Sequence, residues 1–171
     1  MDQSRVRLED RSIPLIDRQQ FRRALGSFAT GVTLATTVAG GEWHGVTANA
    51  VMSVSLEPPL VLLSIQQATR MHAAIAASDR YALNVLAADQ EPIARYFADS
   101  TVTHDTDAFA RFAHHIGRTG VPLLDGTLAA VECRIVGRYA AGDHTLYLGE
   151  VVHLEIGDDQ PPLLYFRGAF R

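Results

Sequence analysis

The amino-acid sequence predicts a mainly β fold, an antiparallel barrel with short helices at its periphery. The chain contains about six or seven short runs rich in Val, Thr and other apolar residues, and hairpin signals join most of them. Helical patterns are few and do not alternate strictly with these runs, which disfavours a doubly wound parallel sheet. The sequence has no Gly-x-Gly-x-x-Gly motif after a strand, so a Rossmann nucleotide site is not expected.

The first half of the chain is expected to begin with a helix and continue with strands. Asp17 followed by Gln20 is typical of a helix N-terminus, and apolar residues then recur at helical spacing. We therefore expect a helix over residues 17–29, ended by Gly31. Strands are predicted over residues 32–39, 42–51 and 60–65, with a hairpin turn at Gly40-Gly41 between the first two.

The second half is expected to mix short helices with longer strands. Helices are predicted over residues 70–78 and 90–98 and near 107–112. Strands are predicted over residues 81–86, 127–139 and 145–156, with a last short strand within 161–166. We expect one domain over residues 15–171, preceded by a polar N-terminal arm over residues 1–14.

Composition excludes several classes of protein. With 171 residues, 47% of them hydrophobic and 20% charged, the sequence is that of an ordinary globular domain. A net charge of −4 gives no reason to expect nucleic acid, and the single cysteine, Cys133, excludes a disulfide framework. The charged N-terminus and the lack of a long apolar run predict a cytoplasmic protein with no membrane partner.

Two segments carry candidate ligand-binding residues. Thr47 and Asn49 lie among small and apolar residues, a pattern that suits a phosphorylated ligand and equally ordinary turn chemistry. Ser64, Gln66 and Arg70 follow a buried strand and open a helix, which suits an anion site and equally a capped helix. Because all 15 basic residues are arginine, an anion would have to be bound by arginine, hydroxyls or backbone N–H groups.

The remaining motifs give no catalytic nucleophile. His144 lies in a Gly-Asp-His turn, which suits substrate contact or plain exposure to solvent. Cys133 falls on the apolar face of a strand and is expected in the core. A Gly-x-Ser-x-Gly elbow is missing from the sequence, and His114-His115 lacks the spacing of zinc ligands on a helix, so no metal site is expected.

A series of segments, in their order and spacing, resembles the short-chain flavin reductase family, whose fold is the FMN-binding split barrel. The resemblance covers roughly residues 17–170, and the ordered set is specific where no single segment is. The segments are FRRALGSFATGVT (21–33), GVTANA (45–50), SVSLEPPLV (53–61), NVL (84–86), ARYF (94–97), GDH (142–144), GEV (149–151) and PLLYFRG (162–168).

The resemblance implies one site for FMN or FAD and another for NADH or NADPH. The residues implied for the flavin are Gly45, Val46, Thr47, Asn49, Ala50, Ser64, Ile65, Gln66, Arg70 and Phe97. Those implied for the nicotinamide nucleotide are His144, Tyr165, Phe166, Arg167 and Gly168. Many relatives carry Ser where this chain has Ala50 and Tyr where it has Phe170, so one hydroxyl is lost at each position.

The resemblance further implies a homodimeric reductase that passes reduced flavin to a separate oxygenase. Hydride would move directly from nicotinamide to flavin, so the reaction needs neither a protein nucleophile nor a metal. Two alternatives stay open: a split-barrel flavoprotein with tightly bound FMN that reduces a metal complex or corrinoid, and a non-enzymatic flavin-binding protein. The sequence decides neither FMN against FAD nor NADH against NADPH.

Overall fold

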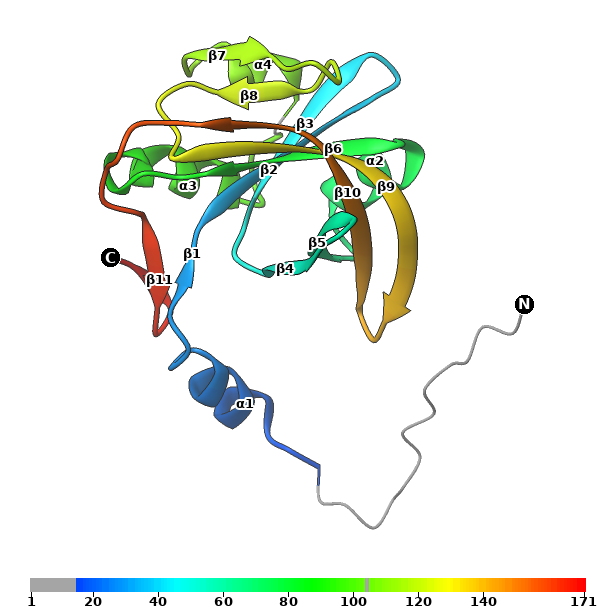
Figure 1. Ribbon diagram of the computed structural model, residues 1–171. Coiled ribbons are helices and arrows are strands. Elements are labelled where there is room, and N and C mark those ends of the chain that lie inside the picture. Colours follow the sequence, from blue (N-terminus) through cyan, green and yellow to red (C-terminus); the bar gives the residue numbers. More distant parts are fainter. Residues whose placement is uncertain (1–14, 104) are drawn as a thin grey trace, which may run out of the picture.

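The computed structural model describes residues 15–103 and 105–171, so the N-terminal arm predicted over residues 1–14 lies outside the described residues (Figure 1). Its helices are α1 (Arg18–Leu25), α2 (Arg70–Ala77), α3 (Glu91–Ala98) and α4 (Thr106–Phe109), with a 3₁₀ turn at Ala88–Gln90. Its longer strands are β2 (Thr33–Ala39), β3 (Glu42–Ala48), β4 (Val51–Leu56), β5 (Pro59–Gln66), β6 (Arg80–Val85), β9 (Ala129–Ala141) and β10 (His144–Ile156). The short strands are β1 (Thr30–Gly31), β7 (His114–Ile116), β8 (Pro122–Leu124), β11 (Leu164–Phe166) and β12 (Ala169–Phe170).

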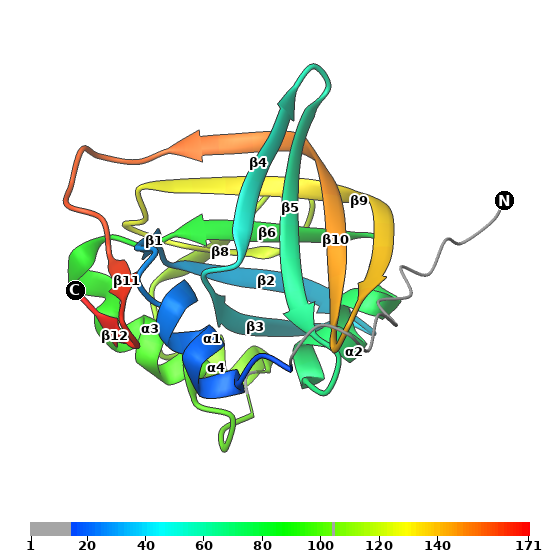
Figure 2. The same cartoon turned by 90° about the horizontal axis from the view of Figure 1, so that it is seen from below.

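One large antiparallel sheet forms the body of the molecule. Its seven strands follow the order β3-β2-β6-β9-β10-β5-β4. Figure 2 shows β4 and β5 crossing over β2, β3 and β6, because β9 and β10 curve and carry the sheet round on itself. The mainly β, antiparallel fold class predicted from the sequence is therefore confirmed. Within the described residues, no helix is long and apolar enough to cross a membrane.

The large sheet has a hydrophobic core on each of its faces. Side chains alternate along a strand, so neighbouring residues of β2 point to opposite faces. Ala35 packs in a core with Leu63 and Tyr147 that α2 covers, whereas Leu34 packs with Phe97 under α3 and α4. Since both faces are covered, β2 is buried at five successive positions, from Thr33 to Thr37.

Three threonines in β2 fit this buried strand because their hydroxyls have acceptors. Thr33 donates to the carbonyl of Ala48 at 2.8 Å, and Thr36 donates to that of Pro122 at 2.8 Å. Thr37 donates to the carbonyl of Arg80 at 2.7 Å. A buried hydroxyl without a partner would cost free energy, whereas a β-branched side chain with a bonded hydroxyl suits a strand.

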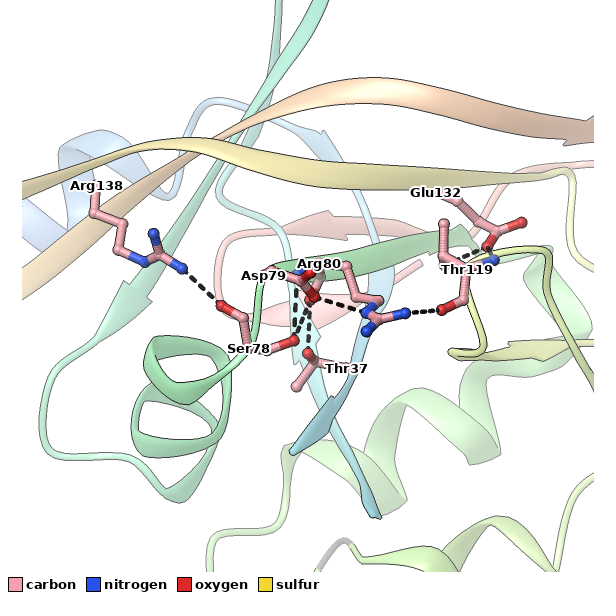
Figure 3. A network of polar contacts seen from close by, with 7 residues as sticks. All are labelled: Thr37, Ser78, Asp79, Arg80, Thr119, Glu132 and Arg138. Atoms are coloured by element: carbon pink, nitrogen blue, oxygen red, sulfur yellow. Dashed lines mark hydrogen bonds and ion pairs between the residues drawn. The ribbon is translucent and has the colours of Figure 1, made fainter. Parts of the chain in front are cut away.

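Arg80 and Arg138 form hydrogen bonds that link the ends of β6 and β9 to neighbouring loops (Figure 3). The guanidinium of Arg80 contacts Asp79 at 2.7 Å and donates to the carbonyl of Thr119 at 2.6 Å. Arg138 donates to the carbonyl of Ser78 at 2.6 Å. The loop before β8 is thereby held against the sheet.

The first helix begins where the sequence predicts and ends earlier. The Asp17 side chain accepts hydrogen bonds from the backbone N–H groups of Gln19 and Gln20, both at 2.9 Å, which caps α1 as expected. The helix ends at Leu25, so the predicted extension to residue 29 is wrong. Gly26 is its C-cap, with its N–H bonded to the carbonyl of Arg22, and a short strand then begins at Thr30.

The strands also differ from prediction, and the short strands β1 and β12 were not predicted. The strand expected over residues 42–51 ends at Ala48, and residues 51–56 form a separate strand, β4, that pairs with β5. The small hairpin of β7 and β8 was not predicted. The turn at Gly40-Gly41 is confirmed, with φ of 59° and 86°, values that favour glycine.

Cys133 is fully buried, as the sequence predicts for a core residue. Burial raises the pKa of its thiol to about 12. Because the thiolate is the reactive form, this cysteine is unsuited to nucleophilic chemistry at neutral pH.

Candidate functional site

A hollow of about 760 Å³ lies between α2, α3 and β3. This volume is in the range usual for small-molecule sites. Predicted flavin-binding residues supply part of its lining, namely Gly45, Val46, Gln66, Arg70 and Phe97. The remaining lining comes mainly from small residues of α2 and from the segment after α3, which includes Ser100 and Thr103.

Gly45 and Phe97 form the floor of this hollow. A Cβ atom at Gly45 would lie 2.9 Å from the Phe97 ring and 3.0 Å from the Phe109 ring, closer than carbon atoms pack. Phe97 is fully buried, and its ring contacts Phe109 with 5.2 Å between centroids. The absence of a side chain at position 45 therefore lets β3 pack directly on the aromatic core.

Arg70 brings a positive charge to the rim of the hollow. It is the first residue of α2, whose N-cap, Thr69, accepts a hydrogen bond from the N–H of His72 at 3.2 Å. The exposed guanidinium donates to the hydroxyl of Thr103 at 2.5 Å. Among the described residues no carboxylate lies within 4.0 Å of it, so its charge is not neutralised. An arginine at a helix N-terminus suits a phosphate.

The end of β5 lies between two other predicted parts of the site. On one side, the N–H of Ser64 donates to the carbonyl of Ala50 at 3.0 Å. On the other side, β5 pairs with β10, and Gln66 lies directly opposite His144. A residue implied for the flavin is thus next to one implied for the nicotinamide. Ile65 is buried in the core, which leaves its backbone rather than its side chain for ligand contact.

The turn that carries His144 is held by residues that the sequence did not single out. The N–H of Gln67 donates to the carbonyl of Asp143 at 2.9 Å, and its amide donates to the carbonyl of His144 at 3.0 Å. His72 forms a 3.0 Å hydrogen bond with Thr145. Only the pairing of β5 with β10 places these residues together, so local sequence patterns carry no signal for them.

The His144 ring is hydrogen-bonded to its neighbour in the turn. Nδ1 of His144 lies 2.8 Å from a carboxylate oxygen of Asp143. The hydrogen bond and the charge of His144 lower the pKa of Asp143. The carboxylate is therefore ionised at neutral pH and orients the imidazole.

The side chains of Thr47 and Asn49 form hydrogen bonds with other residues of the same chain. The hydroxyl of Thr47 donates to the carbonyl of Ala94 in α3 at 2.7 Å. The amide of Asn49 donates to the hydroxyl of Thr30 at 3.2 Å, and Thr30 pairs with Tyr165. These bonds fix the end of β3 against α3 and β1.

The C-terminal residues implied for the nicotinamide nucleotide lie in a different part of the fold from His144. Tyr165 and Phe166 belong to β11, and Arg167 and Gly168 form the turn to β12 with φ of 51° and 81°. The N–H of Arg167 donates to the carbonyl of Gly26 at 2.8 Å. Figures 1 and 2 both place β11 and β12 far from the β9–β10 turn, so one chain does not bring this segment to His144.

Comparisons with known proteins identify relatives of this chain. Residues 25–171 match the family described as flavin reductase like domain. An NADH-dependent flavin reductase from Rhodococcus is 44% identical over 161 residues, which cover 92% of this chain and 88% of that protein. Other relatives are named as reductase components of monooxygenases.

Two solved structures have the same fold. The flavin reductase component of a bacterial two-component tryptophan halogenase superposes with a TM-score of 0.86 at 36% identity, covering 91% of this chain and 97% of that one. The Streptomyces globisporus NADH:FAD oxidoreductase, in complex with NAD and FAD fragments, superposes with a TM-score of 0.84 at 42% identity. The match covers 93% of this chain and 96% of that one. The family match over residues 25–171, the 44% identity to the Rhodococcus protein and the shared fold lead to one assignment: the chain belongs to the flavin reductase like domain family.

Proposed function

We propose that this chain is an NAD(P)H:flavin oxidoreductase that transfers hydride from a nicotinamide nucleotide to FMN or FAD. The observation that carries the proposal is the pairing of Gln66 with His144, beside a hollow whose rim bears the Arg70 charge. NADH dependence is favoured because the Rhodococcus and Streptomyces relatives are named for NADH.

In the proposed reaction the protein binds the nicotinamide nucleotide and the flavin and orients them for hydride transfer. Hydride leaves C4 of the nicotinamide and joins N5 of the flavin, so the nucleotide is oxidised as the flavin is reduced. The two reacting atoms must approach to about 3–3.5 Å. In this proposal Arg70 binds the flavin phosphate, the β5 end and the segment from Gly45 to Ala50 hold the ring and ribityl chain, and His144 contacts the nicotinamide nucleotide.

A steady-state assay tests this function. Purified protein is mixed with NADH or NADPH and with FMN, FAD or riboflavin, and oxidation of the nucleotide is followed at 340 nm. We expect turnover that depends on added flavin. If neither nucleotide is oxidised with any flavin, the proposal is wrong. Flavin that stays bound through gel filtration would instead indicate the tightly bound FMN alternative, and flavin binding without bleaching by NAD(P)H a non-enzymatic protein.

We also propose that the protein is a homodimer that supplies reduced flavin to a separate oxygenase. The α1 segment supports the first part, because Phe21, Leu25 and Phe28 are 55%, 55% and 73% exposed and the helix buries no residue. The relatives named as reductase components support the second. The cytoplasmic location stays a prediction.

Light scattering after gel filtration tests the dimer. We expect twice the mass of one chain, and a lower mass for the double substitution Phe21→Asp with Leu25→Asp. Arg18→Asp, on the same helix, is the matched control and should leave the dimer intact. A wild-type protein that elutes as a monomer at micromolar concentration would contradict the dimer without affecting the assay for flavin reduction.

A further inference from the structure

A histidine and two glutamates meet where β9 pairs with β10, and none of them lines the hollow. Glu132, His153 and Glu155 each offer one ligand atom, and these atoms all lie within 4.8 Å of one another. Glu132 is on β9 and the other two are on β10, where His153 lies nine residues after His144. In an extended strand, nine residues span about 30 Å.

The strand register explains how the three side chains share one face. His153 lies directly opposite Glu132, and Glu155 lies opposite Ala130. The register shifts between Val151 and His153, so β10 advances by two residues while β9 advances by one. Such a bulge re-aims the side chains that follow it. Here it turns His153 to the side of Glu132, and Glu155 follows two residues later on the same face.

Glu132 is the fixed member of the group. Its side chain is fully buried, and its two oxygens accept hydrogen bonds from the N–H groups of Arg118 at 3.0 Å and Thr119 at 2.7 Å, and from the Thr119 hydroxyl. Figure 3 shows the carboxylate meeting Thr119. A carboxylate offers about four lone-pair positions, so these three bonds leave one open.

The charges of the group are not balanced by arginine. Within the described part of the chain, no arginine lies within 4.0 Å of the Glu132 or Glu155 carboxylate. The basic groups that face Glu155 are two imidazoles, that of His153 at 3.8 Å and that of His115 at 3.2 Å. Two carboxylates that converge on one imidazole, one of them fully buried, favour a divalent cation.

A second histidine orients Glu155. Nδ1 of His115 lies 2.7 Å from Asp125, and its Nε2 lies 3.2 Å from one oxygen of Glu155 and 3.4 Å from the other. Both oxygens of Glu155 therefore face His115, and the one that lies 3.4 Å from His115 is also the one that lies 3.8 Å from His153. Outer hydrogen bonds of this kind, from a carboxylate through a histidine, are typical partners of metal ligands because they fix ligand orientation.

We propose that Glu132, His153 and Glu155 bind one divalent transition-metal ion of the zinc class. One imidazole nitrogen and two carboxylate oxygens are ligands that zinc accepts at about 2.0–2.2 Å, and three protein ligands leave a further position for water. The ion cross-links β9, β10 and the loop at residues 117–120, which is a stabilising role independent of flavin reduction. Residue spacing carries no signal for this site, because the ligands come from two strands and one strand contains a bulge.

Metal titration of the whole protein tests the site. Protein freed of metal with a chelator, and then of chelator, is titrated with Zn²⁺ by calorimetry and with Co²⁺ by visible absorption. We expect one equivalent per chain. At about a hundred times the dissociation constant, Zn²⁺ should raise the melting temperature by about 5–10 °C. His153→Ala and Glu155→Gln should each weaken binding by at least about tenfold, and Asp125→Asn by about tenfold.

His144→Ala is the matched control, since it removes another histidine that is paired with a carboxylate at 2.8 Å but has no second carboxylate. It should leave Zn²⁺ affinity unchanged. Far-UV circular dichroism of the metal-free variants checks their folding, and Glu155→Gln, a half-exposed position, keeps the test valid if His153→Ala does not fold. The proposal is overturned if the wild type shows no saturable binding, or if neither His153→Ala nor Glu155→Gln alters it.

Discussion

The side-chain amide of Gln67 donates a 3.0 Å hydrogen bond to the backbone carbonyl of His144. The same residue bonds the carbonyl of Asp143 through its own N–H at 2.9 Å. Gln67 thereby ties the start of α2 to the turn of the β9–β10 hairpin. If His144 contacts the nicotinamide nucleotide, Gln67 is the residue that positions it.

Gln67→Ala removes the amide and leaves the backbone bond. Loss of one hydrogen bond costs about 0.5–1.5 kcal/mol, so we expect the KM for NADH to rise about 2- to 12-fold while kcat falls less. Steady-state kinetics at saturating flavin measure both constants. Gln160→Ala is the control. An unchanged KM for NADH would show that the turn keeps its position without this amide.

The pH dependence of the turn follows from Asp143. Its pKa is lowered by the hydrogen bond and charge of His144, so the pair contributes stability above the ordinary carboxyl pKa. That contribution is lost as pH falls through the lowered pKa. We expect Asp143→Asn to melt at a lower temperature than the wild type at pH 6, and this difference to shrink as the pH falls below the ordinary carboxyl pKa. A difference that grows towards pH 3 would contradict this assignment.

The Arg70 guanidinium is expected to select flavins that carry a phosphate. A hydrogen bond to a charged group contributes about 1.5–3 kcal/mol, so Arg70→Ala should raise the KM for FMN by about 10- to 150-fold. Riboflavin has no phosphate, so its KM should stay the same. Arg70→Lys should have a KM for FMN between those of the wild type and Arg70→Ala, because lysine keeps the charge but lacks the bidentate fork. Arg118→Ala, at a second exposed arginine, is the control and should leave the KM for FMN unchanged. If Arg70→Ala raises the KM for FMN and the KM for riboflavin equally, a phosphate contact is excluded.

The sequence predicted the fold class better than it predicted the first and last residues of the helices and strands. Runs of Val and Thr predict strands wherever they occur, and a strand such as β2 is recognisable because both its faces are buried. β4 was missed because its apolar residues, among them Met52 and Leu56, are exposed and alternate with serines, so the segment lacks the apolar run of a buried strand. The end of α1 at Gly26 was missed because apolar spacing continues beyond it to Phe28.

The candidate site was predictable only where its residues are close in sequence. Ser64 to Arg70 form one strand end and one helix start, so their grouping follows from local pattern. The pairing of Gln66 with His144 depends on the register of two strands that are distant in the chain. Local periodicity carries no information on that register. The convergence of His153 on Glu132 further depends on a bulge, which periodicity does not reveal.

Packing beneath the hollow gives a last prediction. A Cβ at Gly45 would lie 2.9 Å from Phe97 and 3.0 Å from Phe109, and both rings are fully buried. Gly45→Ala should therefore lower the free energy of unfolding by about 1–3 kcal/mol, measured by urea denaturation. Gly31→Ala is the matched control, since a Cβ there meets nothing within 4 Å.

The double substitution Gly45→Ala with Phe97→Leu separates a steric clash from a backbone effect. A smaller side chain at position 97 relieves the clash, so the double variant should be more stable than the sum of the two single losses implies. Strict additivity would mean that the Phe97 ring already yields to the new methyl group. In that case Gly45 would not be needed for packing, and its value would lie in the approach of a ligand to the β3 backbone.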